Sequence, residues 1–130
     1  MYNPFWNKTI TIFTPLPSET NVKWYKYIFK NVFFKIRGYK TDGSNYSENK
    51  SSIIRIQNTS FLDYDEWIHS NKDIFFSLNN ESILIPRYVE DIISDNTSGT
   101  ELFDKYQCVK PTSITNNLYA YCPHVLIVGD

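Results

Sequence analysis

The sequence CPHVLIVGD, residues 122–130, closes the chain with its most apolar run and decides the expected fold. Four consecutive apolar residues, 125–128, lie between Pro123 and Gly129, and a short run flanked in this way is typical of a strand buried on both faces. A chain end is usually polar and frayed. We therefore expect residues 125–128 to form a strand, either in the protein's own sheet or docked into a neighbouring molecule.

Working outward from this run, residues 113–128 are expected to form a hairpin whose turn is favoured by Asn116 and Asn117. Alternating polar and apolar residues, or β-branched residues, predict further strands. These strands are expected at 9–14, 22–29, 32–39 and 52–58, with two short ones inside 74–87. Lys30 and Asn31 separate two of the runs and predict a tight turn or a bulge, because Asn tolerates a positive φ.

Two segments depart from strand periodicity. Asp63 and Glu66 have the spacing of a capping box, which predicts a short helical turn within 63–73. Residues 101–109 are expected to begin with a helical turn and to continue as a strand. Pro86 places the strand before it at an edge or an exit position, and residues 15–20 are expected to be a loop.

The predicted fold class is therefore mainly β. We expect residues 1–130 to form a single domain, a small β-barrel or sandwich of about seven or eight short antiparallel strands with one or two short helical turns. The segment 40–52, KTDGSNYSENKSS, contains one apolar residue and is expected to be a flexible loop. Because long loops in compact domains are often functional, it is the candidate channel or docking loop. Its candidate residues are Lys40, Asp42, Asn45, Tyr46 and Lys50.

Aromatic residues make up 17% of the chain, with ten Tyr, nine Phe and three Trp, which is too many for one small core. Tyr and Trp offer rigid contact area with a polar group, so some of them are expected at an interface. The candidate interface aromatics are Tyr2, Phe5, Trp6, Trp24, Trp67 and Tyr119. An alternative is a carbohydrate- or peptide-binding β-sandwich that uses Trp24, Tyr25, Trp67 or Tyr119 as a platform.

The net charge of −1 disfavours a dedicated duplex-DNA binder, which normally carries a basic excess. A local basic cluster is expected to be the solvated face of a hairpin, with a phosphate-binding face as the alternative; it contains Lys23, Lys26, Lys30, Lys35, Arg37 and Lys40. No apolar run approaches 18 residues, so we expect no membrane partner.

The residues that most often carry chemistry are scattered along the sequence. His69 and His124 lack a second ligand pair at metal spacing, and no third residue orients a Cys108–His124 pair. We therefore expect no catalytic residue, no metal site, no cofactor and no enzymatic activity. Cys108 and Cys122 are expected to be free thiols of a cytosolic protein, because no signal peptide is recognisable at the N-terminus, although a cross-strand disulfide between them is geometrically possible.

Short sequence motifs along nearly the whole chain resemble those of a known protein family. They include YDEW at 64–67, SLNNESILIPRYVEDI at 77–92, DKYQCVKPTSITNN at 104–117 and HVLIVG at 124–129. Taken in order, they resemble a family of small head-completion proteins from tailed bacteriophages and prophages of low-GC Gram-positive bacteria.

This resemblance implies a structural protein of the virion neck, assembled in the host cytoplasm. Such a protein forms a homo-oligomeric ring between the portal or adaptor and the tail, closes the DNA channel as a stopper, and joins head to tail. A tail terminator or an adaptor of the same neck is the alternative. The implied partners are further copies, the portal, adaptor and tail-terminator proteins, and packaged DNA that passes without sequence-specific binding.

Overall fold

The computed structural model describes residues 7–18, 20–40, 46–57, 60–94, 99–117 and 124–130; for 36–40 and 46–50 it describes the backbone alone. The strands are β1 (Lys8–Pro17), β2 (Val22–Lys40), β3 (Tyr46–Ile56), β4 (Ile83–Ile85), β5 (Pro111–Asn117) and β6 (His124–Gly129), and the helices are α1 (Tyr64–Trp67) and α2 (Glu101–Lys105). The predicted mainly β class is confirmed.

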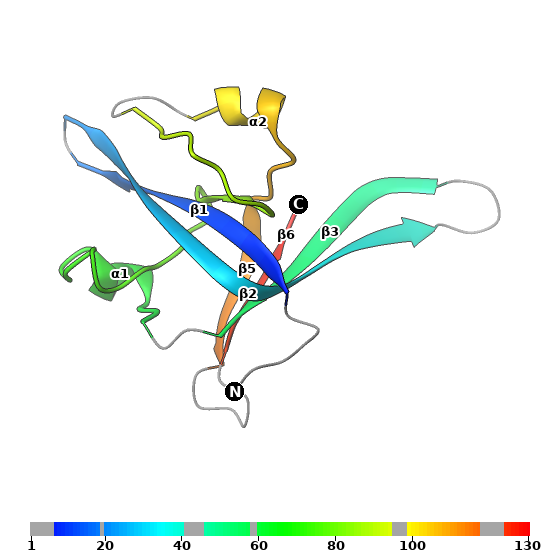
Figure 1. Cartoon of the computed structure of the whole chain (residues 1–130), viewed down its shortest axis with the longest axis horizontal. Coiled ribbons are helices and arrows are strands. Elements are labelled where there is room, and N and C mark those ends of the chain that lie inside the picture. Colours follow the sequence, from blue (N-terminus) through cyan, green and yellow to red (C-terminus); the bar gives the residue numbers. More distant parts are fainter. Residues whose placement is uncertain (1–6, 19, 41–45, 58–59, 95–98, 118–123) are drawn as a thin grey trace.

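These strands form one antiparallel sheet in the order β4-β1-β2-β3-β6-β5 (Figure 1). The sheet is open and is not a closed barrel. It curves so far that Val109, just before β5, makes a single bridge with Leu84 in β4, through N–H···O bonds of 2.8 and 2.9 Å. The described part has six strands instead of seven or eight, because residues 74–78 and 109 contribute only isolated bridges.

The C-terminal strand β6 belongs to the protein's own sheet, where it pairs with β3 on one side and with β5 on the other. Val125 and Ile127 are fully buried, whereas Leu126 and Val128 are half-buried. The expectation of burial on both faces is therefore wrong, because at β6 only the concave side of the sheet is fully covered. The predicted hairpin is confirmed in its two strands, but the prediction of its turn at Asn116 and Asn117 is wrong, because both residues lie in β5 and pair with Val125 and His124. Residues 118–123 lie outside the described residues.

Residues 22–40 form one strand of 19 residues rather than two. At Asn31 the backbone adopts φ 58°, and the register with β1 shifts between Ile10↔Phe29 and Lys8↔Val32. One extra residue of β2 is accommodated there, as in a β-bulge, so the bulge alternative is confirmed and the tight turn is wrong. The bulge moves the buried side from odd positions, such as Phe29, to even positions, such as Val32.

The segment 40–52 is mostly strand, which corrects the prediction of a long flexible loop. The pairs Gly38↔Lys50 and Lys40↔Tyr46 extend the β2–β3 ladder, so only residues 41–45 separate the strands, and these lie outside the described residues. Polar side chains do not prevent pairing, since the ladder bonds are made by the backbone. The predicted loop at 15–20 is likewise shorter, because β1 extends to Pro17 and Ser18 donates a turn bond to the Asn21 carbonyl oxygen.

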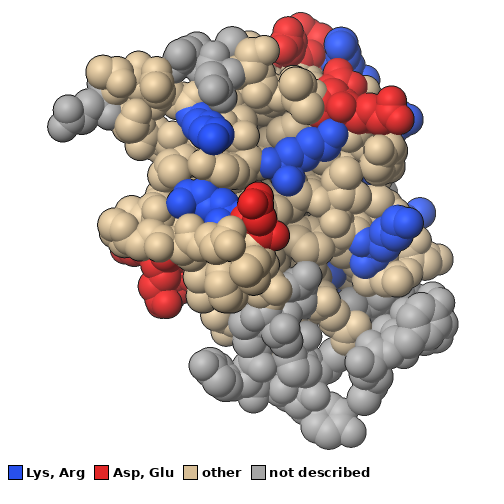
Figure 2. Space-filling model, turned by 60° about the vertical axis from the view of Figure 1, so that its left-hand side comes forward, with Lys and Arg blue, Asp and Glu red and all other residues tan. Residues whose placement is uncertain are grey.

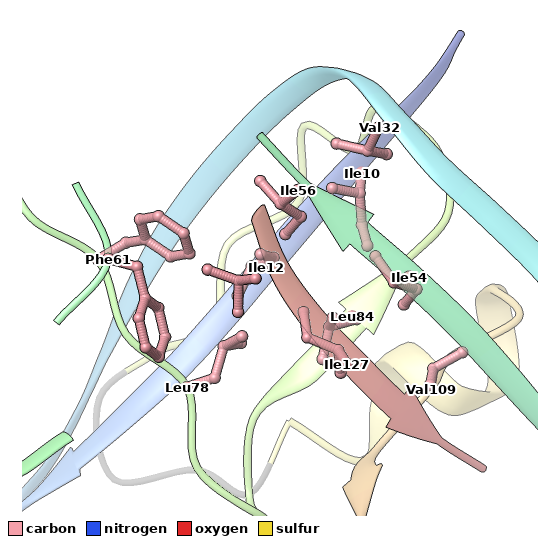
Figure 3. Close-up of a cluster of buried hydrophobic side chains, with 12 residues drawn as sticks. Ile10, Ile12, Val32, Ile54, Ile56, Phe61, Leu78, Leu84, Val109 and Ile127 are labelled. Carbon is pink, nitrogen blue, oxygen red and sulfur yellow. The ribbon is translucent and has the colours of Figure 1, made fainter. Parts of the chain in front are cut away.

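A buried apolar cluster fills the concave side of the sheet (Figure 3). Ile10 and Ile12 of β1, Ile54 of β3 and Ile127 of β6 point toward one another there, with Phe61 and Leu78 from the segment after β3 beside them. Contributions from strands so distant in sequence show that this cluster holds the curved sheet together, since burying apolar area is the main favourable term in folding.

A second buried cluster covers the opposite face of β1 and β4 and includes Phe13, Ile85, Val89 and Leu102. Thr11, which is also fully buried, fixes this layer: its Oγ1 donates to the Arg87 carbonyl oxygen at 2.8 Å and accepts from the Val89 N–H at 3.1 Å. Residues 86–94 and 99–108, with α2, are thereby held on the convex side of the sheet.

Both predicted helical turns are present, but the capping box is not formed. Asp63 occupies the N-cap of α1 without a side-chain hydrogen bond, and its carbonyl oxygen instead accepts from the Glu66 and Trp67 N–H groups. The three-residue strand β4 ends just before Pro86 and lies at the sheet edge, as the proline predicts.

Candidate functional site

The β2–β3 hairpin projects from the body of the molecule beyond the point where β1 and β6 end (Figure 1). Pairing with β1 ends at Val32, and pairing of β3 with β6 begins at Ser52. In the part of the chain that the structure describes, the outer backbone edges of β2 at 36–40 and of β3 at 46–51 therefore have no strand partner. We call the described backbone of 36–40 and 46–51 the arm.

Three of the five predicted docking residues fall on the arm. Lys40 and Tyr46 are Cα partners at the end of the described ladder, and Lys50 lies opposite Gly38. Asp42 and Asn45 lie outside the described residues. The described part of the predicted docking loop is therefore a pair of strands. Their outer backbone edges are open to pairing with a further strand.

Of the six predicted interface aromatics, the structure describes two, Trp24 and Trp67. Trp67 is fully buried, so its assignment to an interface or to a ligand platform is wrong. Trp24 is half-buried against the cluster of Phe13 and Leu102. Tyr2, Phe5, Trp6 and Tyr119 lie outside the described residues.

Trp67 anchors α1 to the sheet. Its indole Nε1–H lies 3.1 Å from the Tyr27 hydroxyl and 3.2 Å from the Phe75 carbonyl oxygen, and the Tyr25 ring meets it edge-on with centroids 5.4 Å apart. The Tyr27 hydroxyl in turn donates to the Lys72 carbonyl oxygen at 2.9 Å. Burial raises the pKa of Tyr27 to about 12, so the hydroxyl remains a donor at every ordinary pH. A structural role therefore accounts for this aromatic cluster.

A row of basic and apolar side chains follows the convex face of β2, and the sequence pattern alone does not separate it from the rest of the basic cluster. Its register is fixed by Lys26 opposite Phe13 and by Phe33 opposite Arg55, whose guanidinium carbon lies 4.9 Å from the Phe33 ring centroid. We call this row the β2 stripe; its members are Lys26, Ile28, Lys30, Phe33, Lys35 and Arg55. The change of strand parity at Asn31 is the signal that could have revealed it.

A second surface lies over α2 and the segment before it. Asp91 accepts from the Tyr106 hydroxyl at 2.8 Å and from Lys105 Nζ at 3.1 Å, which ties residues 87–94 to the end of α2. These two hydrogen bonds, the Tyr106 bond first, hold the pKa of Asp91 below its ordinary value, and the carboxylate raises the pKa of both Lys105 and Tyr106. The Arg87 guanidinium carbon lies 5.4 Å from the Tyr106 ring centroid.

The side chains around this tie are exposed, and apolar groups alternate with carboxylates among them. Ile92 is 74% exposed, Tyr88 54% and Phe103 39%. We call this region the α2 surface; its members are Tyr88, Glu90, Ile92, Glu101, Phe103 and Asp104. On one side of the molecule, carboxylates lie near the upper edge with Lys or Arg side chains beside them, and further carboxylates lie at the middle, next to a basic side chain, and at the lower left (Figure 2).

Cys108 is a free, half-buried thiol that lies 3.5 Å from the Leu102 carbonyl oxygen. Burial raises its pKa to about 11. Cys122 lies outside the described residues. The predicted free thiol is therefore confirmed for Cys108, and the thiol is held in its less reactive, protonated form.

This protonated thiol gives a testable difference in reactivity. In a Cys122→Ser variant, we expect Cys108 at about pH 8 to react with a disulfide reagent on the order of 100-fold more slowly in the folded than in the urea-unfolded chain, because a pKa of about 11 leaves little thiolate. The absorbance of the released thiol measures both rates. Equal rates in the two states would show that Cys108 is not shielded.

The described His residues lie apart: His69 follows α1, and His124 begins β6, where its Nε2 is 3.3 Å from the Asn117 amide nitrogen. Within the described ranges, no three His, Cys, Asp or Glu residues are grouped as metal ligands would be. Among the same residues, no helix has the length and apolar character needed to cross a bilayer.

Comparison with known proteins gives one match. No curated protein and no solved structure matches the chain significantly. A family model matches residues 5–130, which is nearly the entire sequence and includes every described strand and helix. The chain therefore belongs to the family of unknown function DUF6751.

Proposed function

We propose that the protein is a structural component of the bacteriophage neck, where copies form a ring between the portal or adaptor and the tail. In this role the ring closes the DNA channel as a stopper and joins head to tail. The ordered motifs at 64–67, 77–92, 104–117 and 124–129, which resemble head-completion proteins, support the proposal from the sequence.

The arm is the structural observation that carries the proposal. Unpaired strand edges pair readily with another chain, and natural monomers usually shorten, twist or cover them. A two-stranded hairpin that stands alone is also marginally stable in water. The arm combines both properties, because β1 and β6 flank the body of the sheet and not the arm. Such an element gains its stability on docking, which is the property expected of an assembly protein.

Charge is compatible with the proposed position around packaged DNA. The chain carries 13 Lys and Arg against 14 Asp and Glu. Tight neutralisation of many phosphates would hold DNA in place, whereas a nearly neutral protein can surround a channel without retaining it.

The proposal is tested in two steps, of which the first is location. Particles released from a host that produces the protein are purified, and the chain is identified by mass spectrometry and by imaging of the neck at side-chain resolution. We expect one ring of copies between the portal and the tail. Absence of the chain from complete particles, with its presence in the lysate, would refute a neck role.

The second step removes the arm. Residues 38–50 are replaced by Asn-Gly, a favoured two-residue hairpin turn, which joins the Cα partners Arg37 and Ser51. We expect thermal unfolding close to that of the wild type, because both buried clusters lie outside the replaced segment, together with loss of tailed particles that retain DNA.

The matched control changes a different hairpin connection. The variant Thr20→Gly/Asn21→Ser alters two exposed residues at the β1–β2 turn, and it should assemble as the wild type does. A normal particle yield from the arm replacement would contradict a docking role for the arm.

A further inference from the structure

The β2 stripe carries charge that no described carboxylate neutralises. It contains four cations, Lys26, Lys30, Lys35 and Arg55, and no carboxylate. Lys26 and Arg55 lie against the rings of Phe13 and Phe33, at 5.8 and 4.9 Å from the ring centroids. Lys30 and Lys35 are exposed, and neither forms an ion pair within the described part of the chain.

Apolar side chains lie among these cations. Ile28 is 38% exposed and belongs to neither buried cluster. Phe33 is half-buried, with the Arg55 guanidinium against its ring. An apolar row bordered by one sign of charge is the composition of a protein-binding surface, since exposed apolar groups supply area and charges supply orientation.

The α2 surface has the complementary composition. Glu90, Glu101 and Asp104 are exposed there and form no ion pair in the described chain, where Lys105 is bonded to Asp91. Its three exposed apolar side chains include Ile92, which at 74% is the most exposed large hydrophobic residue described. The two surfaces thus match in both properties, with cations facing carboxylates and apolar groups facing apolar groups.

We propose that the β2 stripe of one copy docks against the α2 surface of a second copy. This inference rests on the proposed function only in that a ring requires contacts between copies. Two different surfaces in contact leave one of each free at the ends of a pair, so the contact continues from copy to copy and closes into a ring when the rotation allows it.

The observations favour a second copy over a nucleic acid as the occupant of the stripe. A phosphate backbone would satisfy the cations but would leave Ile28 exposed and the α2 surface unexplained. The net charge of −1 also means that little overall repulsion between identical molecules opposes their association. Because exposed ion pairs are screened, the self-association should weaken with salt.

Charge reversal on the full-length protein tests the contact. Sedimentation velocity at low salt measures self-association of the wild type and of two variants, Lys30→Glu/Lys35→Glu and Glu101→Lys/Asp104→Lys. Each variant should weaken self-association about tenfold or more, because attraction is replaced by repulsion at two positions. The control Lys8→Glu/Lys23→Glu makes the same charge change at exposed positions on the other face of the sheet and should behave as the wild type.

Mixing the two reversed variants gives the decisive result. The reversed stripe of one variant then meets the reversed α2 surface of the other, and the unmodified stripe meets the unmodified α2 surface, so we expect the mixture to associate about as tightly as the wild type, although each variant alone associates at least about tenfold more weakly. Failure of the mixture to associate, an equal effect of the control, or a wild type that stays monomeric would overturn the inference.

Electrophoretic retardation of single-stranded DNA by the same variants tests whether nucleic acid, and not a second copy, binds the β2 stripe. Loss of retardation in the stripe variant, with unchanged self-association, would assign the stripe to nucleic acid and would also overturn the inference. These outcomes are independent of the location of the chain in particles, so a failed contact and a failed neck role can be told apart.

Discussion

Replacement of Trp67 by Ala is expected to lower the free energy of unfolding by about 3–5 kcal/mol, the largest effect of any single substitution considered. Trp67 is fully buried, and its removal leaves a cavity under the Tyr25 and Tyr64 rings, whose centroids lie 5.4 and 5.5 Å from that of the indole. The substitution also removes the Nε1–H donor that faces the Tyr27 hydroxyl and the Phe75 carbonyl oxygen. Helix α1 would then lose the one residue that it buries.

Trp67→Phe is the matched control, because it retains an aromatic ring and loses the indole N–H. We expect it to cost about 1–2 kcal/mol, mainly for the hydrogen bond and part of the ring volume. Urea unfolding followed by circular dichroism measures both variants. A Trp67→Ala variant within about 1 kcal/mol of the wild type would show that α1 is not held by this side chain.

Replacement of Gly129 by Ala is expected to cost about 2–3 kcal/mol, because the added methyl group meets backbone and not a flexible side chain. A Cβ at position 129 would overlap the Lys110 carbonyl oxygen and would lie 2.7 Å from Val109 Cγ1. To make room, the chain at 109–111 has to move away from β6. That movement would strain the reciprocal Lys110–Asp130 hydrogen bonds, both 3.0 Å, and the bridge between Val109 and Leu84.

Amide hydrogen exchange reports this displacement locally. In the Gly129→Ala variant, we expect faster exchange at Leu84, Val109 and Asp130, whose N–H groups make these bonds. Val128→Ala is the control, since it removes a half-buried side chain from the convex face of the same strand without adding an atom near residues 109–111. Unchanged exchange at all three amides would contradict the close approach at Gly129.

Elements with a strong local signal could be predicted from the sequence. The apolar run 125–128 forms a strand of the protein's own sheet, and Asn31 takes the positive φ that its side chain tolerates. Glu101–Lys105 forms the expected helical turn. These predictions depend on the preferences of a few neighbouring residues, which the sequence shows directly.

Predictions of features that depend on backbone pairing between distant segments are wrong. The ladder from Gly38↔Lys50 to Lys40↔Tyr46 is made by main-chain groups, so the polar composition of the segment 40–52 gave no sign of it. The near-closure of the sheet at Leu84 and Val109 depends on its curvature, which no local pattern specifies.

The candidate site likewise has parts that the sequence predicts and parts that it does not. An excess of aromatic residues predicts that some lie at a surface, but it cannot say which. Trp67 can be buried because the Tyr27 hydroxyl and the Phe75 carbonyl oxygen supply partners for its N–H. Tyr27 lies 40 residues away in sequence and Phe75 lies eight residues away, and no sequence motif marks either of them as a partner. The β2 stripe became visible only when the bulge at Asn31 fixed which side chains share a face.

The continuity of β2 through its bulge has a mechanical consequence. The same strand carries the arm and, through the registers from Pro17↔Val22 to Lys8↔Val32, the longest ladder of the body. Tension applied to the arm along the strand is therefore shared by many β1–β2 hydrogen bonds in parallel, so they resist shear together and do not unzip one after another. A load on the arm would pass directly to the interior, with no hinge segment between them.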